Sequence, residues 1–216
     1  MNDAEVKQWH YQKHAEKIIE KMEKKGFKVQ YVNTGAEAKD LIMSLIPQGA
    51  TVVLTGSQTL EQIGVKLALR QSDRYKVIDP FEPGIERAEN LARRRRGMTA
   101  EVMLSSTNAL TEDGALVNVD GAGNRVAGMM FGPDKVILAV GMNKVQPDLE
   151  TAWERIRQIA RPMNNKRLQL PNPCTETGYC QDCSNKTRIC NCFTVIERCF
   201  FPDRIHVVLI GEDLGY

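Results

Sequence analysis

Residues 51–55, TVVLT, form an apolar run that follows the turn Pro47–Gly49. A strand with apolar side chains at consecutive positions is typical of a parallel sheet that is covered on both faces. The runs KVILAV at 135–140 and IHVVLI at 205–210 have the same character. The three runs therefore predict buried strands of a mainly parallel sheet.

Helical patterns alternate with strand patterns along most of the chain. Helices are expected over residues 4–25, from Thr34 as N-cap to 46, from about 59, over 83–96, and from the N-cap Asp148 to a stop at Pro162. Shorter strands are expected at 27–33, 75–79 and 101–105. This alternation implies βαβ units with right-handed crossovers, so we predict an α/β fold in which helices flank the sheet.

The alternation changes between residues 115 and 130. Two short runs with alternating apolar and polar residues, 115–119 and 125–130, are joined by DGAGN at 120–124. Gly and Asn accept positive φ angles, which tight turns between strands require. The pattern therefore predicts an antiparallel hairpin over residues 115–130.

The composition is that of an ordinary globular protein. Of 216 residues, 42% are hydrophobic and 26% charged, and 29 Lys and Arg against 27 Asp and Glu leave a net charge of +2. Such a balance creates no large field for nucleic acid or an anionic membrane, so neither partner is expected. No apolar run approaches the ~20 residues of a membrane span, and the first residues lack the apolar core of a secretory signal. We therefore expect a cytoplasmic protein.

Gly56, Ser57 and Thr59 follow the strand at 51–55 and open the next helix. Open α/β sheets bind ligands at the carboxyl ends of their strands. Glycine allows close approach of the backbone, and helix amides and hydroxyls can bind a carboxylate or phosphate. These three residues are candidates for binding an anion, although Ser57 or Thr59 would also serve as an ordinary N-cap.

A second group of polar residues follows the strand at 101–105. We assign substrate orientation to Asn108 and Asn124, charge pairing to Arg125 or Lys144, and proton abstraction to Asp113 or Asp120. Each of the two aspartates precedes a glycine and is equally suited to a plain turn. Lys144, taken alone, is equally suited to a solvated surface.

All six cysteines lie between residues 174 and 199, whereas a chain stapled by disulfides would scatter them more widely. Cys180 and Cys183 form a C-x2-C pair, and Cys174 and Cys190 are near enough to complete four metal ligands. Four thiolates suit a [4Fe–4S] cluster or a closed zinc site, and the spacing matches no ferredoxin run. Reduced structural thiols or disulfides are the alternative.

Several segments together resemble the lactate-utilisation (LUD) domain family. They are TGSQTLEQIG at 55–64, SSTNALTEDGALVNVDGAGNRVAGMMFGPDKVILAVGMNKV at 105–145, RIRQIARPMNNKRL at 155–168, PCTETGYCQDC at 173–183 and IHVVLIGEDLGY at 205–216. The resemblance implies an α/β domain similar to ribose-5-phosphate isomerase, glucosamine-6-phosphate deaminase and the CoA-transferases. It also implies a part in bacterial oxidation of lactate to pyruvate, within a multi-protein iron–sulfur system. That redox setting favours iron–sulfur over zinc at the cysteines.

We expect an N-terminal helical segment at 1–30 and a LUD-like domain at 31–216, with a Cys-rich metal-binding insertion at about 164–201. The expected function is a component of organic-acid oxidation that binds a small anionic substrate at the strand-end cleft, beside partner oxidoreductase subunits. Two alternatives stay open. One is a non-catalytic electron-transfer or scaffold subunit, and the other is a redox-neutral isomerase- or transferase-like enzyme with structural zinc.

Overall fold

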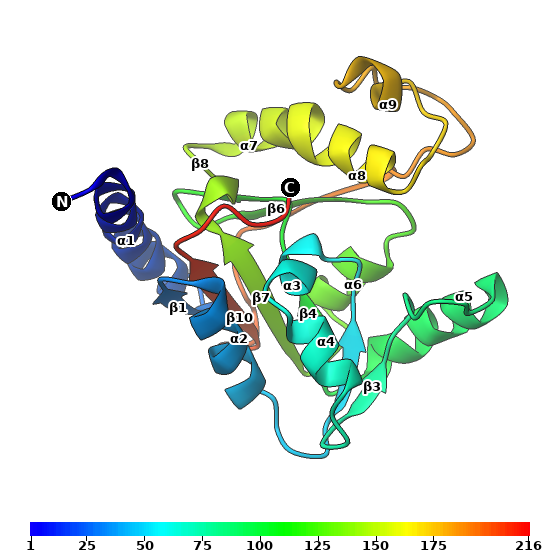
Figure 1. Cartoon of the computed structure of the whole chain (residues 1–216), viewed down its shortest axis with the longest axis horizontal. Coiled ribbons are helices and arrows are strands. Elements are labelled where there is room, and N and C mark those ends of the chain that lie inside the picture. Colours follow the sequence, from blue (N-terminus) through cyan, green and yellow to red (C-terminus); the bar gives the residue numbers. More distant parts are fainter.

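A six-stranded parallel sheet forms the centre of the protein in a computed structural model that describes residues 1–216 (Figure 1). The strand order is β1-β10-β7-β4-β2-β3, and all neighbours are parallel. The strands are β1 (Lys28–Val32), β2 (Thr51–Leu54), β3 (Lys76–Ile78), β4 (Val102–Ser105), β7 (Lys135–Gly141) and β10 (Ile205–Ile210). The predicted α/β class and parallel sheet are therefore confirmed.

Side chains of the central strands alternate between two apolar cores, one on each face of the sheet. Val207 and Leu209 of β10 pack in the same core as Ile18 and Met22 of α1 (Asp3–Glu23). The alternate residue Val208 packs in the opposite core, with residues of α2 (Gly35–Ser44) and α4 (Val65–Arg70). Burial on both faces explains why these strands are apolar at most positions, with His206 of β10 as a buried polar exception.

The helices begin and end largely where their capping residues predict. Thr34 caps α2, because its side chain accepts from the Glu37 amide while Glu37 reaches back to the Thr34 amide. The helix expected from about Thr59 is divided into α3 (Gln58–Gln62) and α4. Gly64 lies between them with a left-handed φ of 76°, which breaks the helical path.

The second sheet is small and mixed, in the order β8-β5-β6-β9. Its strands are β5 (Ala109–Thr111), β6 (Leu116–Asp120), β8 (Val145–Gln146) and β9 (Cys192–Ile196). The predicted hairpin over 115–130 is wrong, because residues after β6 form α6 (Asn124–Met130) instead of a return strand. The antiparallel partners of β6 are β5 and β9, and β9 comes from the cysteine-rich segment.

The helix that starts after Asp148 continues past Pro162, so the predicted stop at that residue is wrong. It consists of α7 (Leu149–Arg155), a π-helical turn (Ile156–Ala160) and α8 (Arg161–Arg167). Proline lacks an amide hydrogen, and a π turn just before it changes the hydrogen-bond pattern that a regular helix would require there. Ala152 and Ile156 pack on Ala109 and Val117, so this long helix covers the small sheet.

Two further helices lie at the periphery of the fold. The short helix α9 (Cys174–Thr177) follows α8, and Figure 1 shows both in a layer above the large sheet. The helix α5 (Arg87–Arg96) projects from the side of the molecule and buries none of its residues. Two 3-10 turns, at Gly97–Thr99 and Met142–Lys144, follow α5 and β7. No helix combines the length and apolar character needed to cross a bilayer.

Candidate functional site

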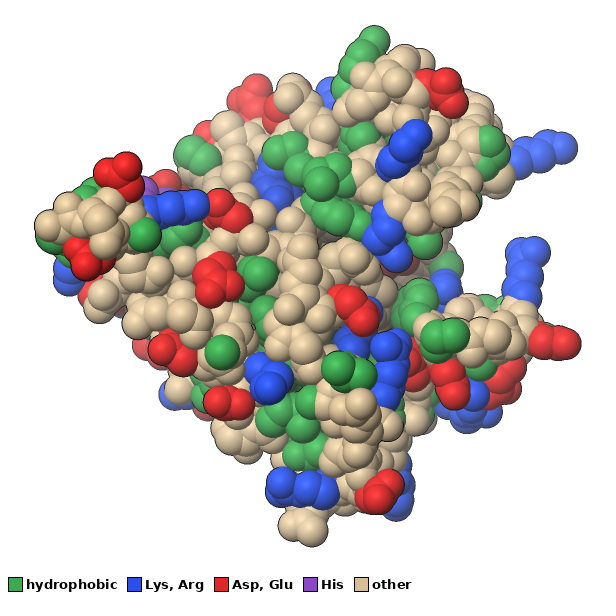
Figure 2. Space-filling model, viewed as in Figure 1, with side chains coloured by type: hydrophobic (Ala, Val, Ile, Leu, Met, Phe, Trp, Pro, Cys, Tyr) green, Lys and Arg blue, Asp and Glu red, His purple; other side chains and the backbone are tan.

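A cavity of about 260 Å³ lies between the carboxyl ends of two strands of the large sheet and the layer above them. Residues 55–58 after β2 and 105–108 at the end of β4 form one side, and the end of β6 and the face of α8 form the others. In Figure 2, basic side chains border a hollow between α5 and the layer of α8 and α9. The position matches that of ligand sites in open α/β sheets.

Most of the predicted catalytic and substrate-binding residues line this cavity. They are Gly56, Ser57, Asn108, Asp120, Asn124, Arg125 and Lys144. Thr59 is fully buried and accepts a hydrogen bond from Lys144, so it lies directly behind the cavity wall. Ser57 caps α3 by accepting from the Leu60 amide, which is the ordinary capping role.

Asp113 lies outside the cavity, in the turn between β5 and β6. Its side chain is 64% exposed and pairs with Lys25 at 3.3 Å. It also accepts a hydrogen bond from the Thr111 hydroxyl, which is the main reason that its pKa is lowered. Asp113 therefore serves the turn, and it is not positioned to take a proton from a ligand in the cavity.

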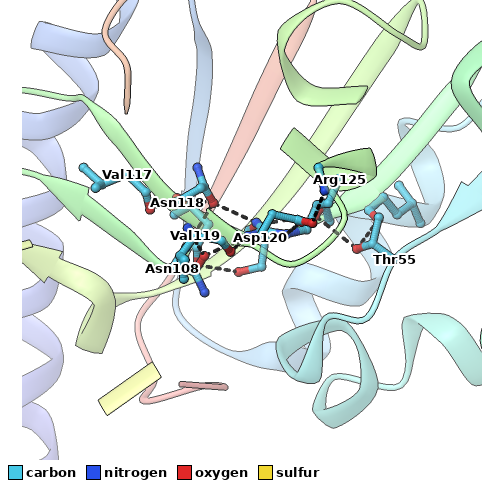
Figure 3. A network of polar contacts seen from close by, with 12 residues as sticks. Thr55, Asn108, Val117, Asn118, Val119, Asp120 and Arg125 are labelled. Atoms are coloured by element: carbon cyan, nitrogen blue, oxygen red, sulfur yellow. Dashed lines mark hydrogen bonds and ion pairs between the residues drawn. The ribbon is translucent and has the colours of Figure 1, made fainter. Parts of the chain in front are cut away.

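Arg125 uses all five of its N–H donors within the protein (Figure 3). The acceptors, with their distances, are Asp120 Oδ2 (3.2 Å), the Ser106 carbonyl (3.0 Å), Asn118 Oδ1 (2.7 Å), Asn108 Oδ1 (2.8 Å) and the Val119 carbonyl (2.7 Å). A guanidinium has five donors and no acceptor, so none is left for a ligand. Arg125 thus positions the cavity wall, and it has no free N–H group for the charge pairing that the sequence predicts for Arg125 or Lys144.

Asp120 and Asn108 are held by this network and still border the cavity. Asp120 Oδ1 accepts from the Gly123 amide at 2.8 Å and closes the turn before α6. Asn108 Oδ1 accepts from the Val119 amide and from Arg125, whereas its Nδ2 donates to no protein group. Asn108 therefore has a donor available for a ligand, and Asp120 keeps lone pairs that can accept a proton.

Lys144 is a buried amine with no carboxylate partner. Its side chain is only 2% exposed, and Nζ donates to Thr59 Oγ1 at 2.8 Å and to Ser106 Oγ at 2.9 Å. Burial lowers the pKa of Lys144 to about 7, and the nearby charges of Arg155 and Arg125 act in the same direction. Near neutral pH the amine is therefore divided between its charged and neutral forms.

Three arginines that the sequence did not nominate for the cavity also line it: Arg94, Arg161 and Arg167. Arg161 is 6% exposed, and both its Nε and that of Arg94 are buried without a hydrogen-bond partner. None of the three forms an ion pair with a carboxylate across the cavity. Because Asp120, the one acidic side chain among the lining residues, is already paired with Arg125, the side chains of the cavity carry an excess of positive charge.

The α8 residues could have been found from their spacing. Arg161, Asn164, Asn165 and Leu168 recur at steps of three and four, so they share one helix face, and all four line the cavity. The prediction that the helix stops at Pro162 places these four residues outside any helix, so their common face is missed. A polar stripe that continues across a proline is the feature that points to them.

Four cysteines converge on a second, much smaller cavity beside the first. Cys174, Cys180, Cys183 and Cys190 all line it, together with Arg161 and Arg188. All six cysteines are free thiols, and burial raises the pKa of Cys174 and Cys190. Cys192 and Cys199 do not line this cavity. These four are the cysteines that the sequence predicts as metal ligands, and their role as ligands stays a prediction.

The thiol set fits a metal in its chemistry, although its members stand apart. No three His, Cys, Asp or Glu groups lie close enough together to hold a metal ion as they stand. Cys180 Sγ accepts hydrogen bonds from Arg161 Nη1 at 3.2 Å and from the Asp182 amide at 3.4 Å. Arg161 and Cys190 line both cavities, so the thiols lie next to the cationic cavity.

A parallel six-stranded sheet with a cationic cavity at the carboxyl ends of its strands, together with a separate small mixed sheet, defines the chain as an α/β protein. The chain belongs to the LUD domain family, whose model matches residues 15–210, and this family is associated with lactate utilisation. A search of curated proteins gave no match. Among solved structures, a DUF162 family protein from Deinococcus radiodurans is similar, with 13% identity and a TM-score of 0.49 over 94% of this chain and 98% of that one.

Proposed function

We propose that the protein binds a small organic anion of the lactate or pyruvate type in the cationic cavity, as a component of organic-acid oxidation. The observation that carries this proposal is the unbalanced charge of the cavity. Lys144 and the guanidinium groups of Arg94, Arg161 and Arg167 border one space without a carboxylate partner among them. Lys144 and Arg161 are almost fully buried, whereas Arg94 is half-buried and Arg167 is exposed. Buried cations are costly unless an anion compensates them, and a ligand carboxylate would supply that charge.

Residues on two sides of the cavity, on α8 and at the sheet, would bind different parts of the ligand. Arg161 donates to Cys180 and Arg167 donates to Asn164, and each guanidinium keeps further N–H donors that suit the oxygens of a carboxylate. On the sheet side, the free Nδ2 of Asn108 donates to a hydroxyl or carbonyl oxygen of the ligand. Asp120, at the same wall, is the group available to accept a proton from a hydroxy acid.

We also propose that Cys174, Cys180, Cys183 and Cys190 hold an iron–sulfur cluster next to this cavity. Such a cluster would supply an acceptor for the electrons of organic-acid oxidation and would pass them to a partner oxidoreductase subunit. The support for this proposal is that four free thiols line one small cavity, although no three of them lie close enough together to hold a metal ion as they stand. Structural zinc on the same four thiolates is the alternative, and it would suit a redox-neutral enzyme.

Calorimetric titration tests the anion site. The panel contains lactate, pyruvate, glyoxylate, inorganic phosphate and lactamide, which has the shape of lactate without its charge. We expect at least one organic acid to bind, and lactamide to fail. Arg167→Gln should weaken binding by about tenfold, the value of one charge-assisted contact, whereas Arg157→Gln should have no effect.

Arg157 is a matched control because it lies on the same long helix, is exposed and does not line the cavity. If the wild-type protein binds none of the acids, the proposal fails. The alternative of a non-catalytic scaffold subunit would then describe the protein better.

A further inference from the structure

We infer that Lys144 is a covalent nucleophile that forms an imine with the carbonyl carbon of an oxo acid in the cationic cavity. The inference rests on the proposed function, because the oxo acid must first occupy that cavity. It goes further in that it names the ligand class, a 2-oxo acid, and gives one residue a bond-forming role. Three features of the site support it.

The first feature is the way in which the amine is held. Thr59 follows β2 and Ser106 follows β4, and both hydroxyls accept from Lys144 Nζ, at 2.8 and 2.9 Å. Two hydrogen bonds fix the direction of the nitrogen, and no protein group accepts a hydrogen bond from its third position. Because Lys144 lines the cavity, a ligand there is the group that can meet that position.

The second feature is the missing counter-charge. Lys66 is buried to a similar degree, at 3% exposed, but it forms an ion pair with Glu61 at 3.1 Å. Lys144 has no such partner, and two arginines, Arg125 and Arg155, repel its proton. A lysine that is desolvated and lies near other cations is the kind that acts as a nucleophile, because much of it is neutral near pH 7.

The third feature is the opposite wall of the cavity. Arg161 and Arg167 line the same cavity from α8, whereas Lys144 lines it from the turn after β7. The guanidinium donors that their bonds to Cys180 and Asn164 leave free would bind the carboxylate of an oxo acid. The adjacent carbonyl carbon then faces the sheet side, where Lys144 lies. Holding one end of the ligand converts a bimolecular attack into an oriented one.

The proposed step is redox-neutral. The Lys144 lone pair forms a bond to the carbonyl carbon, and the carbonyl oxygen gains a proton through the hydroxyl of Ser106 or Thr59. The resulting carbinolamine loses its hydroxyl, after a second proton transfer, as one molecule of water. One amine and one oxo acid thus yield one imine and one water, and hydrolysis reverses the step.

Reductive trapping tests the inference. The purified protein is incubated with pyruvate and cyanoborohydride and is then analysed by intact mass and peptide mapping. We expect a mass gain equal to pyruvate less one oxygen atom, on the peptide that contains Lys144. Lactate has no carbonyl group and should give no adduct. Lys144→Met should lose the adduct, whereas Lys66→Arg, which changes a buried lysine outside the cavity, should keep it.

Peptide mapping of the wild-type protein decides the question even if a variant fails to fold. An adduct confined to other lysines overturns the inference. If calorimetry shows that pyruvate binds and Lys144 still gives no adduct, the covalent role fails while the proposed anion site stands. If neither pyruvate nor any other organic acid binds, the proposed function fails and the inference fails with it.

Discussion

The Lys144 amine lies 2.8 Å from the Thr59 hydroxyl, although 85 residues separate the two in the sequence. Thr59 belongs to the helix that follows β2, and Lys144 to the turn that follows β7. Parallel strands bring their carboxyl ends to one edge of the sheet, so residues that follow different strands meet there. The contact shows how the sheet assembles a polar site from distant segments while the apolar strands supply its support.

Replacing Lys144 with methionine should stabilise the protein at neutral pH. The pKa of Lys144 is about 7 in the folded state and near 10.5 in the unfolded chain, so the unfolded chain binds more protons between these values. The free energy of unfolding of the wild type should therefore rise between pH 7 and 10.5, by up to about 4 kcal/mol. Lys144→Met should lack this rise, because it has no amine to titrate.

Urea denaturation at pH 7 and at pH 10 measures the difference. Lys166→Met is a suitable control, because Lys166 is an exposed residue of α8. Equal pH dependence in Lys144→Met and wild type would show that the amine is not desolvated. Residues of a ligand-binding site often make a protein less stable than apolar residues would at the same positions. A Lys144→Met variant that is more stable than the wild type but no longer traps an oxo acid would fit this trade-off.

Replacing Arg125 with methionine should destabilise the fold. The substitution leaves Asp120 without its ion-pair partner, and the Asp120 side chain is only 10% exposed. It also removes donors from the Ser106 and Val119 carbonyls. We expect a loss of about 3 kcal/mol in the free energy of unfolding, since breaking a mostly buried pair leaves an uncompensated charge.

Arg95→Met is the matched control, because Arg95 is exposed on α5. Its free energy of unfolding should stay within about 0.5 kcal/mol of the wild type, as for most surface changes. If Arg125→Met were as stable as the control, the network of five hydrogen bonds would not carry the stability assigned to it.

The sequence predicts the large sheet well because its signal is local. The run TVVLT at 51–55 and the runs that form β7 and β10 have apolar side chains at consecutive positions, as burial on both faces of a sheet requires. The N-cap residues Thr34 and Asp148 are also local signals, since each caps its helix through residues three positions away. Fold class therefore follows from patterns a few residues long.

The errors arise where long-range pairing decides the structure. Residues 125–130 alternate like a strand, but the partner position beside β6 is taken by β9, about 70 residues further on. No local feature of residues 115–130 indicates that β9, and not residues 125–130, pairs with β6. In the same way, Arg161 and Arg167 line the cavity because the helix continues through a π turn past Pro162. The rule that proline ends a helix predicts the opposite.

The two candidate aspartates should differ in their effect on anion binding. Asp120 lines the cavity, so Asp120→Asn removes its one carboxylate and should tighten the binding of an organic acid severalfold. Asp113→Asn should leave the affinity unchanged, because Asp113 is exposed and lies outside the cavity. Titration of both variants at low salt provides the measurement. Equal affinities in Asp120→Asn and the wild type would mean that the Asp120 charge does not reach the ligand.

The cysteines provide a test that separates iron–sulfur, zinc and free thiols. Cys180 lines the small cavity and accepts hydrogen bonds from Arg161 and Asp182, whereas Cys199 lies outside it and donates to the Phe201 carbonyl. We expect protein purified without oxygen to contain iron and to absorb broadly near ~400 nm. Cys180→Ser should lose most of that metal and absorption, and Cys199→Ser should keep both.

Far-UV circular dichroism of the two serine variants checks that loss of metal is not loss of fold. A colourless wild-type protein with one bound zinc would favour the structural site and the redox-neutral enzyme, since four thiolates close a zinc site. Protein that holds neither metal, with all six thiols free under anaerobic conditions, would refute a metal centre. In that case any role of these cysteines would depend on the free thiols themselves and not on a bound metal. Cys190 would then be the first residue to substitute, because it lines both cavities.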